Sequence, residues 1–261
     1  MARAYGGALL FSFPLLMTME MWSLGVSVEP VRLLIFLIVS APILLGLSYF
    51  AGFEPTFQLK DEVLDALAAF GVGCVLSAIL LWLFGVLEQH PTPRHAVGKI
   101  ALCAIPAALG ALLASKQMGE RDEAAMRRAE GCGPWGDIFL MAVGATALAF
   151  NVAPTEEMIL IAYQMDAGQA LILMSVSIGL LHAFVYSLGF PGEARRREAG
   201  GFLRTFVSFT APGYGVALLC SLYLLWTFGR TDGVALHEIA AMTIVLGFPA
   251  SLGAATARLV I

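Results

Sequence analysis

The sequence predicts an all-α membrane protein with eight transmembrane helices, arranged as two tandem, parallel four-helix repeats. Of its 261 residues, 59% are hydrophobic and only 13% are charged, and the mean hydropathy is +0.83. Soluble domains are about 45–50% apolar and about 25% charged. Stretches long enough to cross a bilayer, about 20 apolar residues, recur along the chain. Residues of the first half also reappear in order in the second half.

Eight apolar stretches have a length suited to a membrane span. In chain order they are 5–27, 31–53, 63–87, 97–115, 138–164, 168–190, 203–228 and 236–258. The first of them contains Glu20 and lacks a clear cleavage site, so we interpret it as a span and not as a signal peptide. The connections are short and carry most of the proline, glycine and charge.

The longest connection divides the chain into halves. It is the charged stretch 116–136, and long polar connections of this kind separate compact parts of a chain. We therefore expect a first four-helix repeat over 1–115, a linker over 116–136 and a second four-helix repeat over 137–261.

A shift of 137 to 144 positions superimposes the two halves, and the shift changes only in loops. The matched pairs include Thr18 and Thr155, Glu20 and Glu157, Tyr49 and Tyr186, Trp82 and Trp226, and Pro106 and Pro249. Because each repeat has an even number of spans, both repeats enter the membrane from the same side. The pseudo-two-fold axis is therefore expected along the membrane normal.

Basic residues predict the orientation. The side that holds both termini and the linker carries eleven Lys and Arg residues, and the other side carries four. The positive-inside rule then places both termini in the cytoplasm, with the chain in a bacterial inner membrane. The net charge of −4 and the pI near 5.6 give no sign of a nucleic-acid partner.

Two acids within the apolar stretches are the main functional candidates. Glu20 and Glu157 lie about 15 and about 19 residues past the start of their spans, which is about 22 Å and about 28 Å at 1.5 Å per residue. Ionisable groups at such depth are costly and usually face a cavity or a partner. Thr18 and Thr155 precede them by two positions in both repeats. Two carboxylates and two hydroxyls would form an oxygen cage suited to a divalent cation, or would share a proton. The alternative is a local packing role for each acid.

Residues around these acids extend the predicted site. Asn151 and Glu156 flank the second acid, and Pro14 and Pro154 would free backbone carbonyls beside each one. A second set of acids is expected at the outer ends of the spans, where it would concentrate cations. This outer rim consists of Glu29, Asp166, Glu88 and Asp232. His182 lies within a span and would either relay protons or bond a neighbouring helix.

Two segments carry a family resemblance. They are Phe11-Ser-Phe-Pro-Leu-Leu-Met-Thr-Met-Glu-Met-Trp22 and Asn151-Val-Ala-Pro-Thr-Glu-Glu-Met158. The chain resembles, over nearly its whole length, a family of bacterial multi-pass membrane proteins that is a domain of unknown function. That resemblance implies no activity. The Pro-Thr-Glu-Glu stretch is also similar to the acidic repeats of calcium/cation exchangers, but those repeats are inverted, so we treat it as an analogy of chemistry.

The sequence thus predicts a channel or carrier for cations, with Glu20 and Glu157 as ligands of a divalent metal or calcium ion. No cofactor is expected beyond such an ion, and the expected partners are the lipid bilayer and cations. Two alternatives stay open: a membrane-embedded enzyme acting on a lipid or prenyl substrate, and a partner protein that transports nothing. The sequence does not determine whether the chain forms a homo-oligomer. It contains no signature of a known enzyme class.

Overall fold

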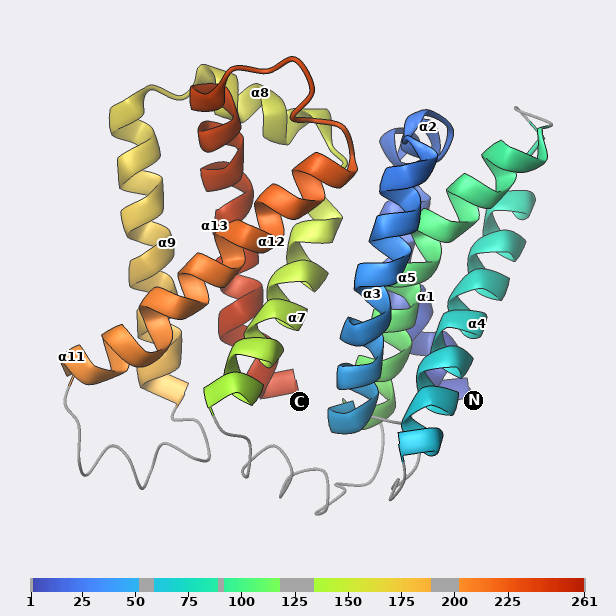
Figure 1. Ribbon diagram of the computed structural model, residues 1–261, viewed down its shortest axis with the longest axis horizontal. Helices are drawn as coiled ribbons and strands as arrows, with labels where there is room; N and C mark the ends of the chain where they lie inside the picture. The colour runs from blue at the N-terminus through green and yellow to red at the C-terminus, as the bar shows by residue number, and fades with distance from the viewer. Residues whose placement is uncertain (1, 52–58, 89–91, 118–133, 189–201, 261) are drawn as a thin grey trace. The chain divides into compact units, whose positions relative to one another are not determined.

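A computed structural model describes residues 2–51, 59–88, 92–117, 134–188 and 202–260 (Figure 1). The chain divides into two compact units, Met1–Met126 and Arg127–Val260. The described residues form helices and turns, with no strand among them. Seven of these helices are long and apolar enough to cross a membrane, and one bent helix pair would make an eighth span. The predicted all-α membrane class is confirmed.

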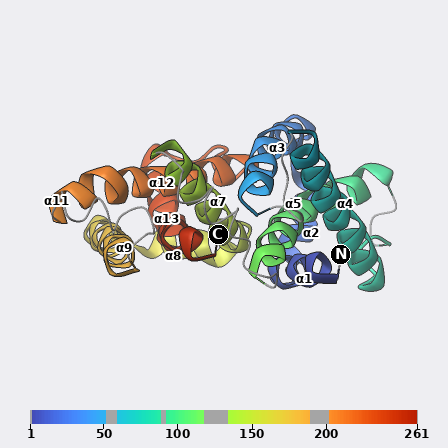
Figure 2. The same ribbon diagram turned by 90° about the horizontal axis from the view of Figure 1, so that it is seen from below.

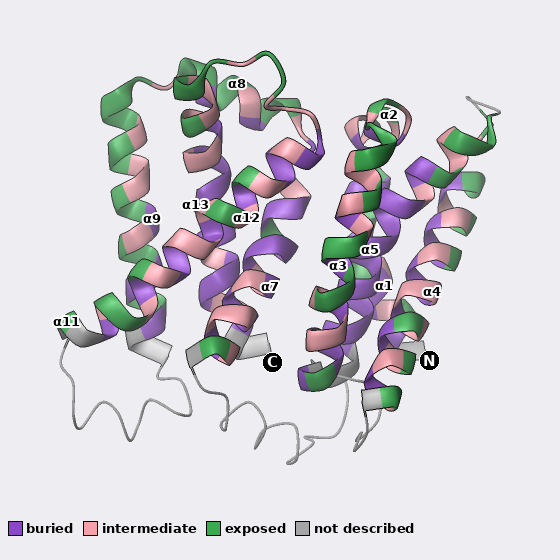
Figure 3. Cartoon of the chain, in the orientation of Figure 1, coloured by how far each residue is buried: buried purple, intermediate pink, exposed green. Residues whose placement is uncertain are grey.

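Unit 1 is built around its last helix. Its helices are α1 (Ala2–Leu16), α2 (Met19–Ser27), α3 (Pro30–Ala51), α4 (Leu59–Leu83) and α5 (Pro93–Gln117). Helix α5 packs against the other four (Figure 2). Every residue over 101–114 is buried, so this part of the helix has no face left for the surroundings (Figure 3).

Small residues allow helices α1 and α2 to approach α5 closely. A Cβ atom added at Gly7 of α1 would collide with the Gly110 carbonyl of α5, and one at Gly98 of α5 would collide with the Gly25 carbonyl of α2. Close approach at small residues is the usual basis of helix association in membranes, because lipid removes the hydrophobic driving force between helices.

Unit 2 has the same plan. Its helices are α7 (Pro134–Val152), α8 (Glu156–Gln164), α9 (Ala167–Leu188), α11 (Phe202–Thr205), the π-helix η1 (Phe206–Thr210), α12 (Ala211–Thr227) and α13 (Leu236–Val260). The last helix, α13, packs against α7, α8, α9 and α12. Here Gly144 of α7 and Gly253 of α13 make the close approach, since a Cβ on either would strike the other's carbonyl oxygen.

Two of the predicted spans, 5–27 and 138–164, are each divided into two helices. Helix α1 ends at Leu16, and α2 leaves it at 83°. Helix α7 ends at Val152, and α8 begins at Glu156. Pro154 explains the second break, because proline lacks an N–H and disfavours a helical residue before it. Pro14 instead remains in the last turn of α1, and the chain turns after it, at the extended residue Thr18.

The seventh predicted span, 203–228, also departs from one regular helix. It begins with the single turn α11, continues as five π-helical residues, and becomes α-helical only at Ala211. The remaining predicted spans correspond to continuous helices with ends shifted by a few residues. Residues 118–133 of the predicted linker 116–136 lie outside the described residues, so the linker stays a prediction.

Candidate functional site

The break in unit 1 is held by side chains that bind the end of α1. The Thr18 hydroxyl donates a hydrogen bond to the Leu15 carbonyl (2.8 Å), and the Trp22 indole N–H donates one to the Leu16 carbonyl (2.8 Å). The last carbonyls of a helix have no intrahelical partner. These two bonds therefore satisfy the end of α1 and fix the direction in which α2 departs.

The break in unit 2 uses the same threonine and a different second donor. The Thr155 hydroxyl donates to the Val152 carbonyl (2.8 Å). Arg230, in the turn after α12, donates from Nη2 to the Pro154 carbonyl (2.8 Å). The Asn151 amide donates to the Ala147 carbonyl one turn back (2.9 Å). Protein donors thus occupy the carbonyls of Val152 and Pro154 at this break.

The predicted carboxylates lie in the first turn of the two short helices. Glu20 of α2 is half-buried, and Glu156 and Glu157 of α8 are exposed. In the part of the chain that the structure describes, none of these three side chains forms a hydrogen bond or an ion pair. The partial positive charge of a helix N-terminus favours a carboxylate at this position.

Each of the two matched acids precedes a buried methionine. Met21 and Met158 are at most 1% exposed, and they anchor α2 and α8 to the rest of their units. Successive helical residues are about 100° apart around the axis, so Glu20 and Glu157 lie beside the anchored face of their helices and not on it. The two acids belong to different units, and their convergence on one ion stays a prediction.

The predicted rim acids lie at the same end of their units as the short helices, and the partners of Glu29 and Asp166 are close in the sequence. Glu29, before α3, lies 3.7 Å from Arg32. Asp166 accepts the Gln169 N–H (2.8 Å) while Gln169 accepts the Asp166 N–H (3.0 Å). This reciprocal pair is a capping box at the start of α9. Glu88 and Asp232 are exposed in the turns after α4 and α12.

Lys99 is a buried basic residue and one of the four that the sequence analysis counted on the side opposite the termini. It lies in α5, is 2% exposed, and donates from Nζ to the Val86 carbonyl (2.8 Å). Its Cα and Cγ lie so close to Gly25 of α2 that a Cβ there would collide with them. A lysine inside the predicted span 97–115 was the signal that could have identified it.

His182 forms a hydrogen bond with a neighbouring helix, which is one of the two roles predicted for it. Its Nδ1 lies 2.8 Å from the Thr210 hydroxyl, at the end of the π-helix, and its ring is edge-on to Phe206 at 5.6 Å. The bond joins α9 to the seventh span in the interior of unit 2. Among the described residues, no group of three or more His, Cys, Asp or Glu side chains could hold a metal ion.

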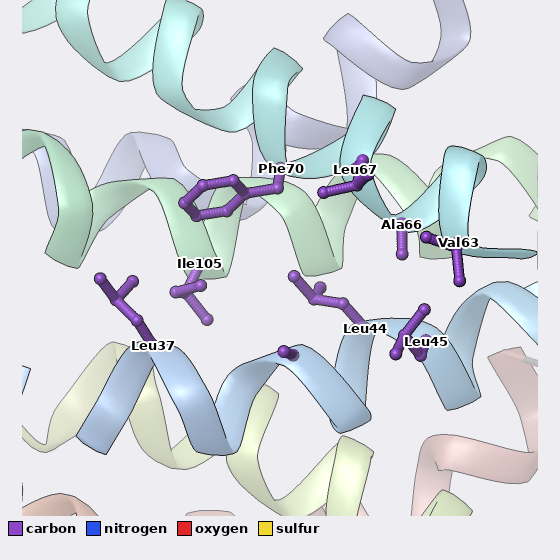
Figure 4. Close-up of a pocket in the computed structure, with 9 residues that line it drawn as sticks. Leu37, Leu44, Leu45, Val63, Ala66, Leu67, Phe70 and Ile105 are labelled. Carbon is purple, nitrogen blue, oxygen red and sulfur yellow. The ribbon is translucent and has the colours of Figure 1, made fainter. Parts of the chain in front are cut away.

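Unit 1 also contains an apolar pocket that the sequence did not indicate. Helices α3, α4 and α5 enclose about 320 Å³, lined only by aliphatic side chains and Phe70 (Figure 4). The small side chains of Ala41 in α3 and Ala66 in α4 leave room for the pocket, and Ile105 of α5 also lines it. Glu62, next to the lining residue Val63, is buried and accepts a hydrogen bond from Ser48 (3.3 Å).

Comparison with known proteins places the whole chain in one family. The family model described as "Putative integral membrane protein (DUF2391)" matches residues 1–261. No curated protein and no solved structure matches the chain. The helices long enough to cross a membrane agree with that description. The chain therefore belongs to the DUF2391 family of multi-pass integral membrane proteins, a domain of unknown function.

Proposed function

We propose that this chain is a membrane transport protein, in which the acid-bearing helices α2 and α8 bind a cation at the entrance of a path. One observation carries the proposal. In each unit the first long helix stops, turns at a threonine, and restarts as a nine-residue helix with a glutamate in its first turn. Broken helices with polar groups at the break are how many transporters build their ion sites.

The proposal includes a tandem duplication with a pseudo-two-fold axis along the membrane normal. The same shift that matches Glu20 with Glu157 also matches the glycines of closest approach, Gly7 with Gly144. The turns after α4 and α12 agree as well, since Gly85 and Gly229 both have φ of 71°. An axis along the normal would bring equivalent helices around a common centre, as a shared ion site requires.

The chemistry of the site follows from its ligands. The Thr18 and Thr155 hydroxyls donate their hydrogens to carbonyls, which leaves oxygen lone pairs for a cation. With Glu20 and Glu157, this set offers only oxygen, which suits calcium or another hard divalent ion. Two nearby carboxylates repel one another unless a cation or a proton lies between them, so transport should depend on pH.

The proposed orientation has both termini in the cytoplasm of a bacterial cell, with the chain in the inner membrane. The excess of basic residues on the side of the termini supports it. In this orientation α2, α8 and the rim acids face the cell exterior, where they would attract cations from solution.

A second candidate is a membrane-embedded enzyme acting on a lipid or prenyl substrate. The apolar pocket of unit 1 favours it, because a long hydrocarbon fits such a lining. The lining itself carries no titratable group, so Glu62 and Ser48 beside it are the nearest candidates for acid–base chemistry. Transport remains our first proposal, because its acid-bearing break occurs in both units.

Flux measurements in proteoliposomes test the transport proposal. The full chain is reconstituted and assayed with K⁺, Na⁺, Ca²⁺, Mn²⁺, Zn²⁺ and H⁺. We expect flux of at least one cation, and a loss of about tenfold or more, equivalent to about 1.4 kcal/mol, when Glu20→Gln and Glu157→Gln are combined. The matched control is Glu238→Gln, an acid that caps its own turn by accepting the Ala235 N–H.

Two results would refute transport by these acids. One is a wild-type chain that moves none of the six cations. The other is a double variant that moves them at the wild-type rate. Gel filtration of each variant in detergent verifies that a loss of flux is not a loss of folding.

A further inference from the structure

Thr210 differs from other hydroxyl residues of unit 2 in the group that it binds. The hydroxyls of Ser177, Ser221 and Thr227 donate to the carbonyl four residues back in their own helix, a common bond of helical serine and threonine. The Thr210 hydroxyl instead lies 2.8 Å from Nδ1 of His182 on α9. Both side chains are buried, with 0% and 7% of their surface exposed. The bond therefore connects two spans inside unit 2.

The π-helix η1 leaves a backbone acceptor beside Thr210. Pro212 has no N–H, and its ring conflicts with a regular α-helical turn before it. The Ala211 N–H binds the Phe206 carbonyl, which is five residues back and not four. Within this described span the Val207 carbonyl thus has no backbone N–H at a spacing of four or five residues. It lies three residues before Thr210, where a threonine hydroxyl can reach it.

The imidazole, the hydroxyl and the proline occur in unit 2 only. The matched positions of unit 1 hold Leu45, Ala66 and Ala68. There α4 continues as an α-helix over Leu59–Leu83, without a π-helical turn. The three features are thus present together in one unit and absent together from the other, which indicates one function that belongs to unit 2.

We propose that His182 is a proton-binding site, in which Thr210 and the Val207 carbonyl hold the proton that the ring takes up. When Nδ1 carries no hydrogen, the Thr210 hydroxyl donates to it. When the ring takes a proton from water, one N–H bond forms, and Nδ1–H donates to the Thr210 oxygen. The hydroxyl hydrogen then turns to the Val207 carbonyl. A threonine hydroxyl can donate and accept, so the same groups bind the ring in both states.

The position of His182 suits a group that gains a positive charge. It lies three residues before the end of the span Ala167–Val185, about 4.5 Å at 1.5 Å per residue. This is the end of unit 2 opposite α8 (Figure 1). A charge costs most at the centre of the bilayer, so it costs less here. The ring centroid of Phe206 is 5.6 Å from that of His182, a distance at which an aromatic ring attracts a cation.

The elements that pack against α9 are α12, α13 and η1, and η1 carries no titratable side chain. The titratable or charged residues of the other two are Tyr214, Cys220 and Tyr223 on α12 and His237, Glu238 and Arg258 on α13. His237 and Glu238 lie in the first turn of α13, at the opposite end of the unit. Tyrosine and cysteine ordinarily ionise above about pH 8, and arginine stays charged. A change of charge at this end between about pH 5 and 8 is therefore assigned to the imidazole.

NMR spectroscopy of the full chain in phospholipid bilayers tests the proposal. The protein carries isotopically labelled histidine, and the signals of His182 are those that disappear in His182→Leu. We expect its ring nitrogens to change from the pattern of a neutral imidazole at about pH 8 to that of an imidazolium at about pH 5. A purely structural bond would keep the neutral pattern at both pH values.

Three variants at the site and one control sharpen the test. Thr210→Val removes the hydroxyl, and we expect it to lower the proton affinity of His182 about tenfold or more, because a hydrogen bond to the charged form favours that form. Thr210→Ser keeps the hydroxyl and should restore the affinity to within about twofold. Pro212→Ala supplies the N–H of a regular helix, and it should weaken proton binding as well. The control is Thr243→Val, whose hydroxyl binds within its own helix and whose loss should leave the titration unchanged.

Two outcomes would overturn the proposal. One is a His182 ring that stays neutral at about pH 5 in the wild-type chain. The other is an unchanged titration in Thr210→Val, with gel filtration showing that the variant is folded. The experiment measures no flux and involves neither Glu20 nor Glu157, so the proton site and the transport proposal can fail separately.

Discussion

At the end that holds the broken first span, the two units use different basic residues in different ways. In unit 1, Lys99 of α5 reaches the turn after α4 and binds the Val86 carbonyl. In unit 2, the position matched to Lys99 is Met242, and the position matched to Val86 is Arg230, which reaches the Pro154 carbonyl. Each unit thus joins two backbone segments at the same end through one cation. The comparison teaches that the bend is kept by the packing around it and not by one fixed residue.

The largest effect should come from the glycines at the closest helix contacts. We expect Gly110→Ala and Gly253→Ala to destabilise their units by about 3 kcal/mol, the upper part of the range for overpacking, because the new methyl group meets backbone carbonyls of α1 and α7. Gly71→Ala and Gly179→Ala are matched controls, because a Cβ there meets nothing within 4 Å. These controls should gain up to about 1 kcal/mol from helix propensity.

Thermal unfolding in detergent, followed with a thiol-reactive dye, measures both effects. Cys103 reports on unit 1 and Cys220 on unit 2, when the other cysteines are replaced by alanine. Equal midpoints for Gly110→Ala and Gly71→Ala would contradict the close approach of α1 and α5.

The buried cations should rank second. Lys99→Met gives unit 1 the residue that unit 2 has at the matched position, Met242. Arg230→Val gives unit 2 the residue that unit 1 has at the matched position, Val86. Each leaves a carbonyl without its donor, and an unsatisfied buried group costs about 1–3 kcal/mol. Glu29→Gln removes the exposed partner of the Arg32–Glu29 pair, and an exposed pair is worth about 0–1 kcal/mol. The same dye assay should therefore give larger losses for Lys99→Met and Arg230→Val than for Glu29→Gln, and equal losses would refute the assigned roles.

The interhelical bond of His182 is a feature that unit 1 lacks, since its matched residue is Leu45. We expect His182→Leu and Thr210→Val each to cost about 0.6–2 kcal/mol, the range for interhelical polar bonds in membranes. In the double variant the losses should be less than additive, because both changes remove one bond. Full additivity in a double-mutant cycle would show that the two residues do not interact.

The smallest effect should come from the threonines at the two breaks. Their hydroxyls bind the preceding helix and do not cap the following one. We therefore expect Thr18→Val and Thr155→Val to cost about 0.5 kcal/mol each, the low end for lost capping bonds. Because both bonds are 2.8 Å long, the two losses of stability should be equal in guanidinium or thermal unfolding. A clear difference between them would show that the two breaks are not stabilised in the same way.

The sequence predicted the helical membrane class and most span positions, because long apolar runs are a strong local signal. It could not predict the turn at Thr18, because a proline such as Pro14 usually only kinks a helix. The 83° bend also depends on contacts between distant residues, such as Trp22 with Leu16 and Gly25 with Gly98.

The candidate site was predictable only in part. The positions of Glu20 and Glu157 at matched places follow from the repeated pattern. Lys99 was counted only for the orientation of the chain, because only the fold brings Val86 and Gly25 around it. For His182 the sequence allowed an interhelical bond, but Thr210 as its partner depends on the π-helical turn.

The central position of the last helix in each unit bears on how the protein is made. A ribosome releases α1 to α4 before α5, and α7 to α12 before α13. At about 5–20 residues per second, a 25-residue helix such as α5 or α13 needs about 1–5 s to emerge. Until then the earlier helices lack the surface on which they assemble. A nascent chain stalled before position 93 would therefore expose Gly7, Gly25 and Gly73 to lipid, where membrane quality-control proteases could recognise the incomplete bundle.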